Sequence, residues 1–498
     1  MLPCRGVARR GAARGLTVLG VASILHAACA PRELAPLPEV VVVADTDLPV
    51  PLFSRLRVDL YAEDGTWFDS RDYVRPDRRD WPTSFGIYAD EDGRERVVWV
   101  RLRIYPEGAT FPYRGERFRR WDNPFASADK GSGPRLVRGD RDLTPALYPS
   151  PLTSVDRLVA VRVGPAHTGR THVVLHGACA TTMAHLGPEG RPSFATSESC
   201  VDTEKTWSAV EEAPLLSRDT PLPETRVGTW LASDEPCEAG RDEAPRICIP
   251  GGATLLGSNG DTGQVLDPDG SAAPTVVRLF GIHSFAIDRD EVTVARFRAA
   301  RARGFDGQTA EVGARCTFTA SPGVHEAYPV SCVDWDTARA FCKFEGGDLP
   351  TELQWEHAAS VAGFREKTPF PWGVDAPRCE DAVLQRDDAR RETSACKSLG
   401  LGPAPIGTGA RDVTPLGVRD LLGGLIEWTR DGWASYHSLR WGTAPIVDPT
   451  TDPSSQKTRV TRGNSWQTSA LITSERYEVD PSAAQVAIGF RCAYPREP

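Results

Sequence analysis

The stretch Val330–Ala359 constrains the fold more than any other part of the sequence, because it predicts two short helices joined by a glycine turn. Asp334 is suited to cap the first helix, since its side chain can accept from the first free N–H groups. Three apolar residues then recur at helical spacing and predict one buried face: Ala338, Phe341 and Cys342.

The end of the first helix and the start of the second are both marked. Gly346 and Gly347 predict a stop at positive φ, which glycine adopts without a steric cost. Thr351, followed three residues later by Gln354, forms a capping box for the second helix.

The same stretch resembles the sulfatase-modifying-factor family, whose enzyme members generate formylglycine. The shared pattern is a Trp-rich helix that ends in Cys, followed by G-x-LPTE-x-x-WE, here Trp335, Cys342, Gly347, Leu349–Glu352, Trp355 and Glu356. Further landmarks follow in the family order: Ile249–Gly252, Phe285–Asp288, Pro371–Gly373, Leu416–Leu421, Arg462–Trp466 and Gly489–Cys492. The resemblance implies an α+β, C-type-lectin-like domain over residues 246–498.

The preceding half of the chain has a different pattern. Residues 51–200 alternate between apolar and polar at 56–61, 98–105 and 158–163, which predicts an antiparallel β-sandwich domain. Residues 30–50 are Pro-rich and predict a tether, in which Val40–Val43 is a candidate for a first strand. Residues 201–245 are acidic and Pro-rich and predict a linker. A hydrophobic fraction of 40% and a net charge of −9 with interspersed signs favour a globular chain and argue against a nucleic-acid partner.

Residues 1–29 resemble a bacterial lipoprotein signal. Four arginines precede an apolar run, Leu16–Leu25, that is too short to span a bilayer, and Ala27-Ala28-Cys29 follows as a small-residue cleavage site. The resemblance implies that Cys29 carries a lipid and anchors the protein in the cell envelope. The alternative is ordinary cleavage near Ala28, with Cys29 unmodified.

Ten cysteines remain after Cys4 and Cys29, an even number that predicts disulfides in an exported chain. Neighbour spacing favours four pairs: Cys179–Cys200, Cys237–Cys248, Cys316–Cys332 and Cys379–Cys396. The family resemblance implies the fifth pair, Cys342–Cys492.

Formylglycine-generating members of the family are copper oxidases that bind copper(I) through two cysteines after an R-G-G-S-[WY] element. Here the two positions fall on Thr468 and Thr473. An alcohol is a poor ligand for soft copper(I) and has no thiol redox chemistry. We therefore expect no catalytic residue here and no copper cofactor.

Two further sites follow from the resemblance. It implies a cleft for a peptide or glycan lined by residues such as Trp428, Arg462, Ser465 and Trp466. The family's calcium loop keeps Glu427 but has Gly424 in place of Asn, so a structural calcium ion is allowed but not predicted. The alternative is that Glu427 pairs with an arginine or caps a loop.

His172 and His176 form an H-x-x-x-H pair, and some relatives use such a pair on a helix, with a Glu, to bind iron. Here the pair flanks a strand-like run, which would place the two residues about 13 Å apart. This spacing argues against a shared metal ion.

The sequence thus favours a non-catalytic, membrane-tethered module that binds a peptide or glycan. One alternative is a formylglycine-generating or other oxygen-dependent oxidase with a rearranged site, and another is a purely structural envelope protein.

Overall fold

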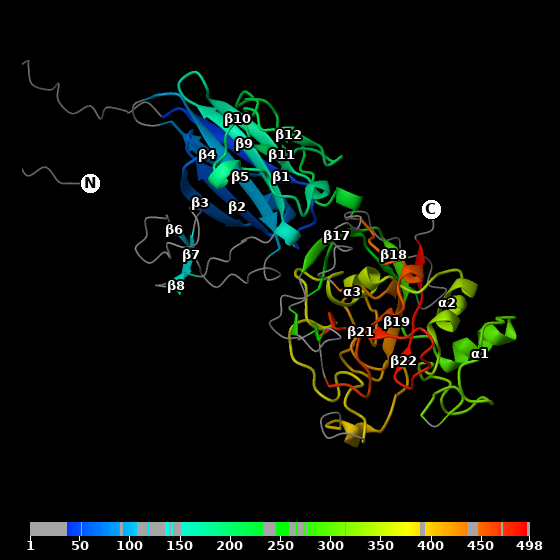
Figure 1. Ribbon diagram of the computed structural model, residues 1–498. Coiled ribbons are helices and arrows are strands. Elements are labelled where there is room, and N and C mark those ends of the chain that lie inside the picture. Colours follow the sequence, from blue (N-terminus) through cyan, green and yellow to red (C-terminus); the bar gives the residue numbers. More distant parts are fainter. Residues whose placement is uncertain are drawn as a thin grey trace, which may run out of the picture. The chain divides into compact units, whose positions relative to one another are not determined.

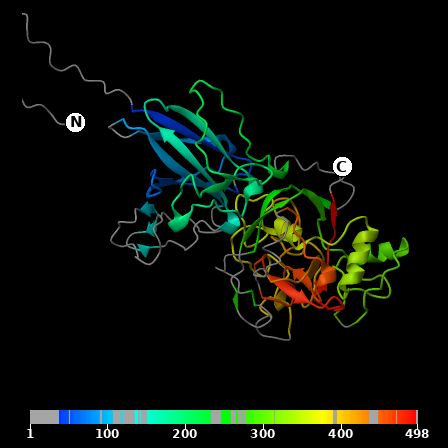
Figure 2. The same ribbon diagram turned by 45° about the horizontal axis from the view of Figure 1, so that its top comes forward.

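The computed structural model describes residues 37–50, 52–89, 93–106, 117–119, 135–138, 141–142, 151–232, 246–257, 265–266, 272–273, 277–313, 315–388, 394–435, 447–469 and 472–495. Figures 1 and 2 show it in two views. The predicted signal segment, with Cys29, lies outside these residues, as does Cys237.

Two sheets make up most of the N-terminal half (Figure 1). The first has the order β10-β1-β4, formed by β10 (Gly169–Leu175), β1 (Glu39–Thr46) and β4 (Thr83–Tyr88). The second has the order β3-β2-β5-β9, formed by β3 (Trp67–Val74), β2 (Arg55–Tyr61), β5 (Arg96–Tyr105) and β9 (Val155–Val163). Buried residues of both sheets, such as Val42, Val100 and Val173, belong to one hydrophobic cluster.

The structure corrects two predictions about this half. The candidate strand Val40–Val43 is confirmed as part of β1, but the predicted tether 30–50 is corrected there, since β1 pairs with both β10 and β4 as the middle strand of its sheet. Pairing is also not antiparallel throughout, since β1 and β10 run parallel with Val40 opposite Gly169.

The predicted linker 201–245 is ordered in its first part. Strand β12 (Trp207–Ala209) pairs with β11 (Glu198–Cys200) as a hairpin, and Ala213 N–H donates to the Ala160 carbonyl of β9 at 2.8 Å. Residues 233–245 lie outside the described part. A small separate sheet contains β6 (Arg117–Arg119), β7 (Arg135–Arg138) and β8 (Arg141–Asp142).

Small sheets and three short helices form the C-terminal half. One sheet joins β13 (Arg246–Ile249), β18 (Phe285–Asp288) and β23 (Ala493–Pro495), and another joins β21 (Arg476–Val479), β20 (Arg459–Arg462), β19 (Ile426–Gly432) and β22 (Ile488–Gly489). Two hairpins pair β14 (Gly252–Leu256) with β17 (Arg278–Ile282), and β15 (Val265–Leu266) with β16 (Ala272–Ala273). The described helices are α1 (Val294–Ala302), α2 (Trp335–Phe344) and α3 (Glu352–Ser360).

Single turns of 3-10 helix lie between these elements. They are η1 (Arg78–Asp80), η2 (Pro151–Thr153), η3 (Gly177–Cys179), η4 (Pro188–Gly190), η5 (Trp230–Ala232), η7 (Lys397–Leu399) and η8 (Pro453–Ser455). None of the helices in the described ranges is long and apolar enough to cross a membrane.

The caps and the buried face predicted for α2 and α3 are confirmed. Asp334 accepts from the Thr337 N–H, and Thr351 and Gln354 form the reciprocal capping box. The turn between the helices differs in one detail. Gly346 has a φ of +86°, but Gly347 is required for another reason, since a Cβ there would lie 2.4 Å from the Ala493 carbonyl oxygen.

Four predicted disulfides are present: Cys179–Cys200, Cys316–Cys332, Cys342–Cys492 and Cys379–Cys396. Cys248 is also disulfide-bonded, and Cys237, the partner expected for it, lies outside the described residues.

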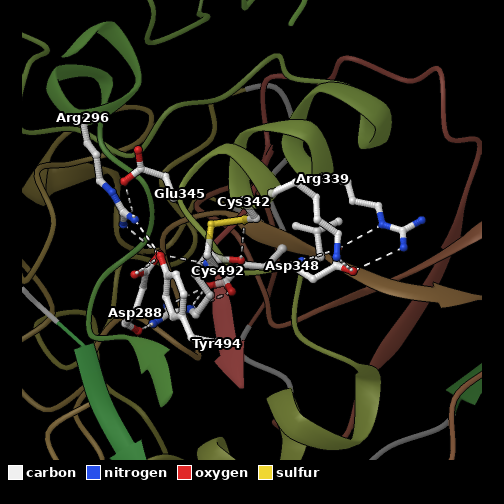
Figure 3. The surroundings of a disulfide bond; sticks show 12 residues. Asp288, Arg296, Arg339, Cys342, Glu345, Asp348, Cys492 and Tyr494 are labelled. Carbon is white, nitrogen blue, oxygen red and sulfur yellow. Dashed lines mark hydrogen bonds and ion pairs between the residues drawn. A yellow bond between two sulfur atoms is a disulfide. The ribbon is translucent and has the colours of Figure 1, made fainter. Parts of the chain in front are cut away.

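Figure 3 shows how the Cys342–Cys492 bridge fastens α2 to the final segment. Beside it, Asp288 accepts from Arg296 Nη1 at 2.7 Å and from the Cys492 N–H at 2.9 Å. The Tyr494 hydroxyl donates to Asp288 at 3.1 Å and accepts from Arg296. The bridge is thus embedded in a polar network that fixes the last strand.

Candidate functional site

The two glutamates of the motif on α3 point into a buried network of charges. Glu352 accepts from Arg476 Nη2 at 2.8 Å, and Glu356 pairs with Arg462 on the neighbouring strand β20. The Arg462 side chain has no exposed surface and also donates to the Ser474 carbonyl at 3.1 Å. Burial lowers the pKa of Arg462 to about 10, a value that leaves it charged at neutral pH. The motif therefore forms paired buried charges.

Glu356 has two further partners. Lys367 forms an ion pair with it and donates to the Leu255 carbonyl at 2.7 Å. The Gly257 N–H donates to Glu356 at 2.8 Å. This carboxylate consequently ties α3 to β14, to β20 and to the segment after the helix.

Glu427 is held by protein groups. Arg491 binds it through Nε and Nη2 at 2.6 to 2.9 Å, and Trp355 Nε1 donates to it at 2.8 Å. This is the arginine pairing that the sequence offered as the alternative to a calcium ion. The neighbouring position 424 has no room for a side chain, since a Cβ on Gly424 would lie 2.9 Å from a Glu291 carboxylate oxygen. The Glu291 carboxylate thus occupies the space that a side chain at position 424 would need. Burial raises the pKa of Glu291.

The hydroxyl groups of Thr468 and Thr473 form hydrogen bonds with backbone groups. Thr468 Oγ1 donates to the Ser465 carbonyl at 2.9 Å and accepts from the Ser465 N–H at 2.9 Å. Thr473 Oγ1 donates to the Pro369 carbonyl at 3.2 Å. All nine cysteines in the described ranges are disulfide-bonded. The described residues thus supply no thiolate and do not fit copper(I).

The four residues predicted to line a cleft lie inside the domain instead. Trp428, Arg462 and Ser465 have no exposed surface and Trp466 is 1% exposed. Trp428 Nε1 donates to the Val333 carbonyl at 2.9 Å, and Arg462 forms ion pairs with the carboxylates of α3. This placement of the cleft is therefore corrected, because these side chains are needed to fill the core and to neutralise buried charge.

Sequence reasoning missed two titratable residues that lie just beyond Thr473. Burial raises the pKa of Glu475 to about 7, and the nearby charge of Arg462 opposes this shift. Burial and Glu475 both raise the pKa of Tyr477, whose hydroxyl lies 3.3 Å from Asn464 Oδ1. Glu475 directly precedes strand β21, so the alternation of that strand could have indicated that Tyr477 and Glu475 share a face.

His172 lies on strand β10 and His176 immediately follows it, as the alternating pattern predicted. The His176 ring lies 3.1 Å from Asp47. Within the described part of the chain, no cluster of three His, Cys, Asp or Glu residues could hold a metal ion.

The C-terminal half is a domain of short helices and small sheets that is held together by disulfides and a buried network of ion pairs. Residues 233–495, more than half of the chain, match the model of the sulfatase-modifying factor enzyme 1-like domain. The chain therefore belongs to this family.

The chain is similar to several named relatives. It is 29% identical to a hercynine oxygenase of Mycolicibacterium smegmatis over 57% of this chain and 66% of the relative. It is 27% identical to the formylglycine-generating enzyme of Thermomonospora curvata over 50% of this chain and 92% of that enzyme. The mouse protein named inactive C-alpha-formylglycine-generating enzyme 2 is 26% identical over 53% of this chain and 90% of the relative.

The chain spans less than two thirds of the hercynine oxygenase and 44% of the mouse formylglycine-generating enzyme. Among solved structures, PvdO of Pseudomonas aeruginosa is 20% identical with a TM-score of 0.39, over 50% of this chain and 94% of that one.

Proposed function

We propose that this chain is an exported, lipid-anchored member of the family that does not catalyse formylglycine formation and instead binds a peptide or glycan in the cell envelope. The observation that carries the proposal is the pair of threonines, Thr468 and Thr473, at the positions where copper-dependent relatives place cysteines. Their hydroxyl groups are bonded to backbone carbonyls.

The chemistry of copper(I) supports this proposal. A two-coordinate thiolate site binds the ion and exchanges one sulfur with the substrate thiol. A threonine hydroxyl can do neither, and the described cysteines are all consumed in disulfides. A relative named as inactive is also consistent with family members that have lost the activity.

The binding role is supported by what the domain retains. The buried network around Glu352, Glu356 and Arg462 and the disulfides keep the scaffold rigid after the thiols are lost. Because Trp428 and Trp466 are buried, contacts with a partner would come from the loops around them rather than from these rings.

The proposal is tested by binding of the purified full-length chain to peptide and glycan arrays and to cell-envelope fractions. We expect saturable binding that survives chelation of metals. Absence of saturable binding on all three would contradict the binding role. A Cys-x-Pro-x-Arg peptide converted to an aldehyde in the presence of copper would favour the alternative, an oxygen-dependent oxidase with a rearranged site.

A further inference from the structure

The N-terminal half contains a pocket that the family domain does not include. Strand β9 is an outer strand of one sheet and β10 an outer strand of the other (Figure 1). A pocket of about 500 Å³ lies against these two strands, the β11–β12 hairpin and residues 210–214. This volume is within the usual range for a small-molecule site.

Backbone hydrogen bonds and a disulfide hold together the segments that form the two ends of the pocket. At one end, Ala213 N–H donates to the Ala160 carbonyl at 2.8 Å, and Leu216 and Arg170 exchange two backbone hydrogen bonds. At the other, the Cys179–Cys200 disulfide joins the turn after β10 to β11. The walls are therefore formed before any ligand arrives, which reduces the entropic cost of binding.

Arg157 provides a cation in this pocket. It lies on β9 at the same alternation as the core residues Val155 and Val159. Its Nη1 donates to the Cys200 carbonyl at 3.1 Å, and burial lowers its pKa while Asp202 opposes the shift. A carbonyl is a weaker partner than a carboxylate, and a guanidinium can bind a carboxylate through two parallel hydrogen bonds.

Two histidines extend the polar side of the pocket. The His172 Nε2 atom is buried and has no hydrogen-bond partner among the described residues. Burial lowers the pKa of His172, so the ring is neutral near pH 7 and can donate one hydrogen bond. In the tautomer with the hydrogen on Nε2, this buried donor lacks a partner, which costs free energy that a ligand acceptor would recover. His176, already beside Asp47, lines the same pocket.

The remaining lining is mixed: Ser199 and Ser208 add hydroxyl groups beside the apolar side chains, and the acids are at the surface. Val159, Val173 and Val210 contribute methyl groups to the lining. Glu211 and Glu212 are exposed, and Glu212 pairs with Arg162. The pocket thus combines a half-buried cation and serine hydroxyl groups with a patch of valine side chains.

We propose that this pocket binds a small-molecule carboxylate with an apolar body, its carboxylate on Arg157 and His172 and its apolar part against Val159, Val173 and Val210. The site is separate from the residues on which the proposed function rests, so either proposal can fail without the other.

Calorimetric titration of the purified full-length chain with octanoate, octanol and inorganic phosphate tests this proposal. We expect saturable binding of octanoate at least about ten-fold tighter than that of octanol, because only the acid forms charge-assisted hydrogen bonds. Phosphate should bind more weakly than octanoate, since it leaves the valines uncovered. Equal binding of octanoate and octanol, or of octanoate and phosphate, would overturn the assignment.

Two variants locate the site. Arg157→Gln should weaken octanoate binding about ten-fold or more, and Val174→Trp should block it by filling the pocket. Arg71→Gln, on the outer strand β3 at the other edge of the same sheet, is the matched control and should bind as the wild type does. Circular dichroism and thermal unfolding of each variant show whether it folds. Wild-type affinity in a folded Arg157→Gln variant would place the ligand elsewhere and contradict the proposal.

Discussion

At the residue scale, the structure converts a sequence motif into a set of charge pairs. Glu352 and Glu356 are 0% exposed and lie in a domain interior, where an unpaired carboxylate would carry a large desolvation penalty. Arg462, Arg476 and Lys367 compensate them. The two glutamates of the pattern LPTE-x-x-WE therefore have a structural role, which does not depend on whether the domain retains catalysis.

Replacement of Arg462 by Met should destabilise the protein by about 3–5 kcal/mol, because it leaves Glu356 and Glu352 short of a buried cation. The free energy of unfolding, from urea titration followed by tryptophan fluorescence, measures this loss. Arg79→Met is the control, since Arg79 pairs with Asp77 at the surface and its side chain is 89% exposed. Equal stability of the two variants would show that the buried network contributes little.

Local residue roles could be predicted from the sequence, but long-range partners could not. The caps at Asp334 and Thr351 depend on residues three positions away, so the sequence contains both partners of each bond. The pairing of Arg491 with Glu427 joins residues 64 positions apart, and no local pattern indicates it. The cleft prediction at Trp428 and Trp466 was wrong because burial depends on such distant contacts.

At the element scale, the fold depends on cross-links between short pieces. Helix α2 has 10 residues and α3 has 9, lengths that are marginal without tertiary support. The disulfide Cys342–Cys492 joins α2 to a segment 150 residues away, whereas Cys379–Cys396 closes a separation of only 17. The long bridge should therefore constrain the unfolded chain more.

The paired variants Cys342→Ala/Cys492→Ala and Cys379→Ala/Cys396→Ala test this difference. The loop-closure model predicts that loss of the long bridge costs about 2 kcal/mol more than loss of the short one. Urea unfolding under identical non-reducing conditions measures both. A larger loss for the short bridge would contradict the entropic account.

Strand pairing was predicted less completely than the helices. Alternating residues located β2, β5 and β9, since period two is a local property. They could not show that β1 lies between β10 and β4, or that β1 and β10 run parallel. Register and neighbour depend on contacts between distant parts of the chain, as Val40 opposite Gly169 illustrates.

At the scale of the whole molecule, buried carboxyl groups set the pH dependence of stability. Burial raises the pKa of Asp431 to about 6 and that of Glu475 to about 7, and it also raises the pKa values of Asp412 and Asp420. Above about pH 4 the unfolded chain has released these protons, while the folded chain holds them up to the raised values. The stability that these groups contribute is full below about pH 4 and is lost as the pH rises through their folded pKa values.

We therefore expect the free energy of unfolding, and with it the urea midpoint, to fall between about pH 4 and pH 7. Each unit by which a folded pKa exceeds the unfolded one contributes about 1.4 kcal/mol to this fall. His357 opposes this trend below about pH 6.5, because burial lowers its pKa to about 4. Glu475→Gln should make the decline less steep. A midpoint that rises over this range would refute the prediction.

The proposed lipid anchor also concerns the whole molecule. Replacement of Cys29 by Ala should move the protein from the membrane fraction to the soluble fraction and abolish labelling with a radioactive fatty acid, because acyl chains supply the membrane affinity. Cys4→Ala, in the predicted signal segment, is the control and should leave both unchanged. Retention of the label in the Cys29→Ala variant would exclude Cys29 as the lipidated residue.

The most direct test of the central claim asks whether this protein can oxidise a thiol. The purified full-length chain, loaded with copper(I) in air, is incubated with a Cys-x-Pro-x-Arg peptide, and the peptide is analysed by mass spectrometry beside an active formylglycine-generating enzyme. With Thr468 and Thr473 in place of the two cysteines, we predict that the peptide keeps its thiol. Conversion of the cysteine to an aldehyde by this chain would contradict the account.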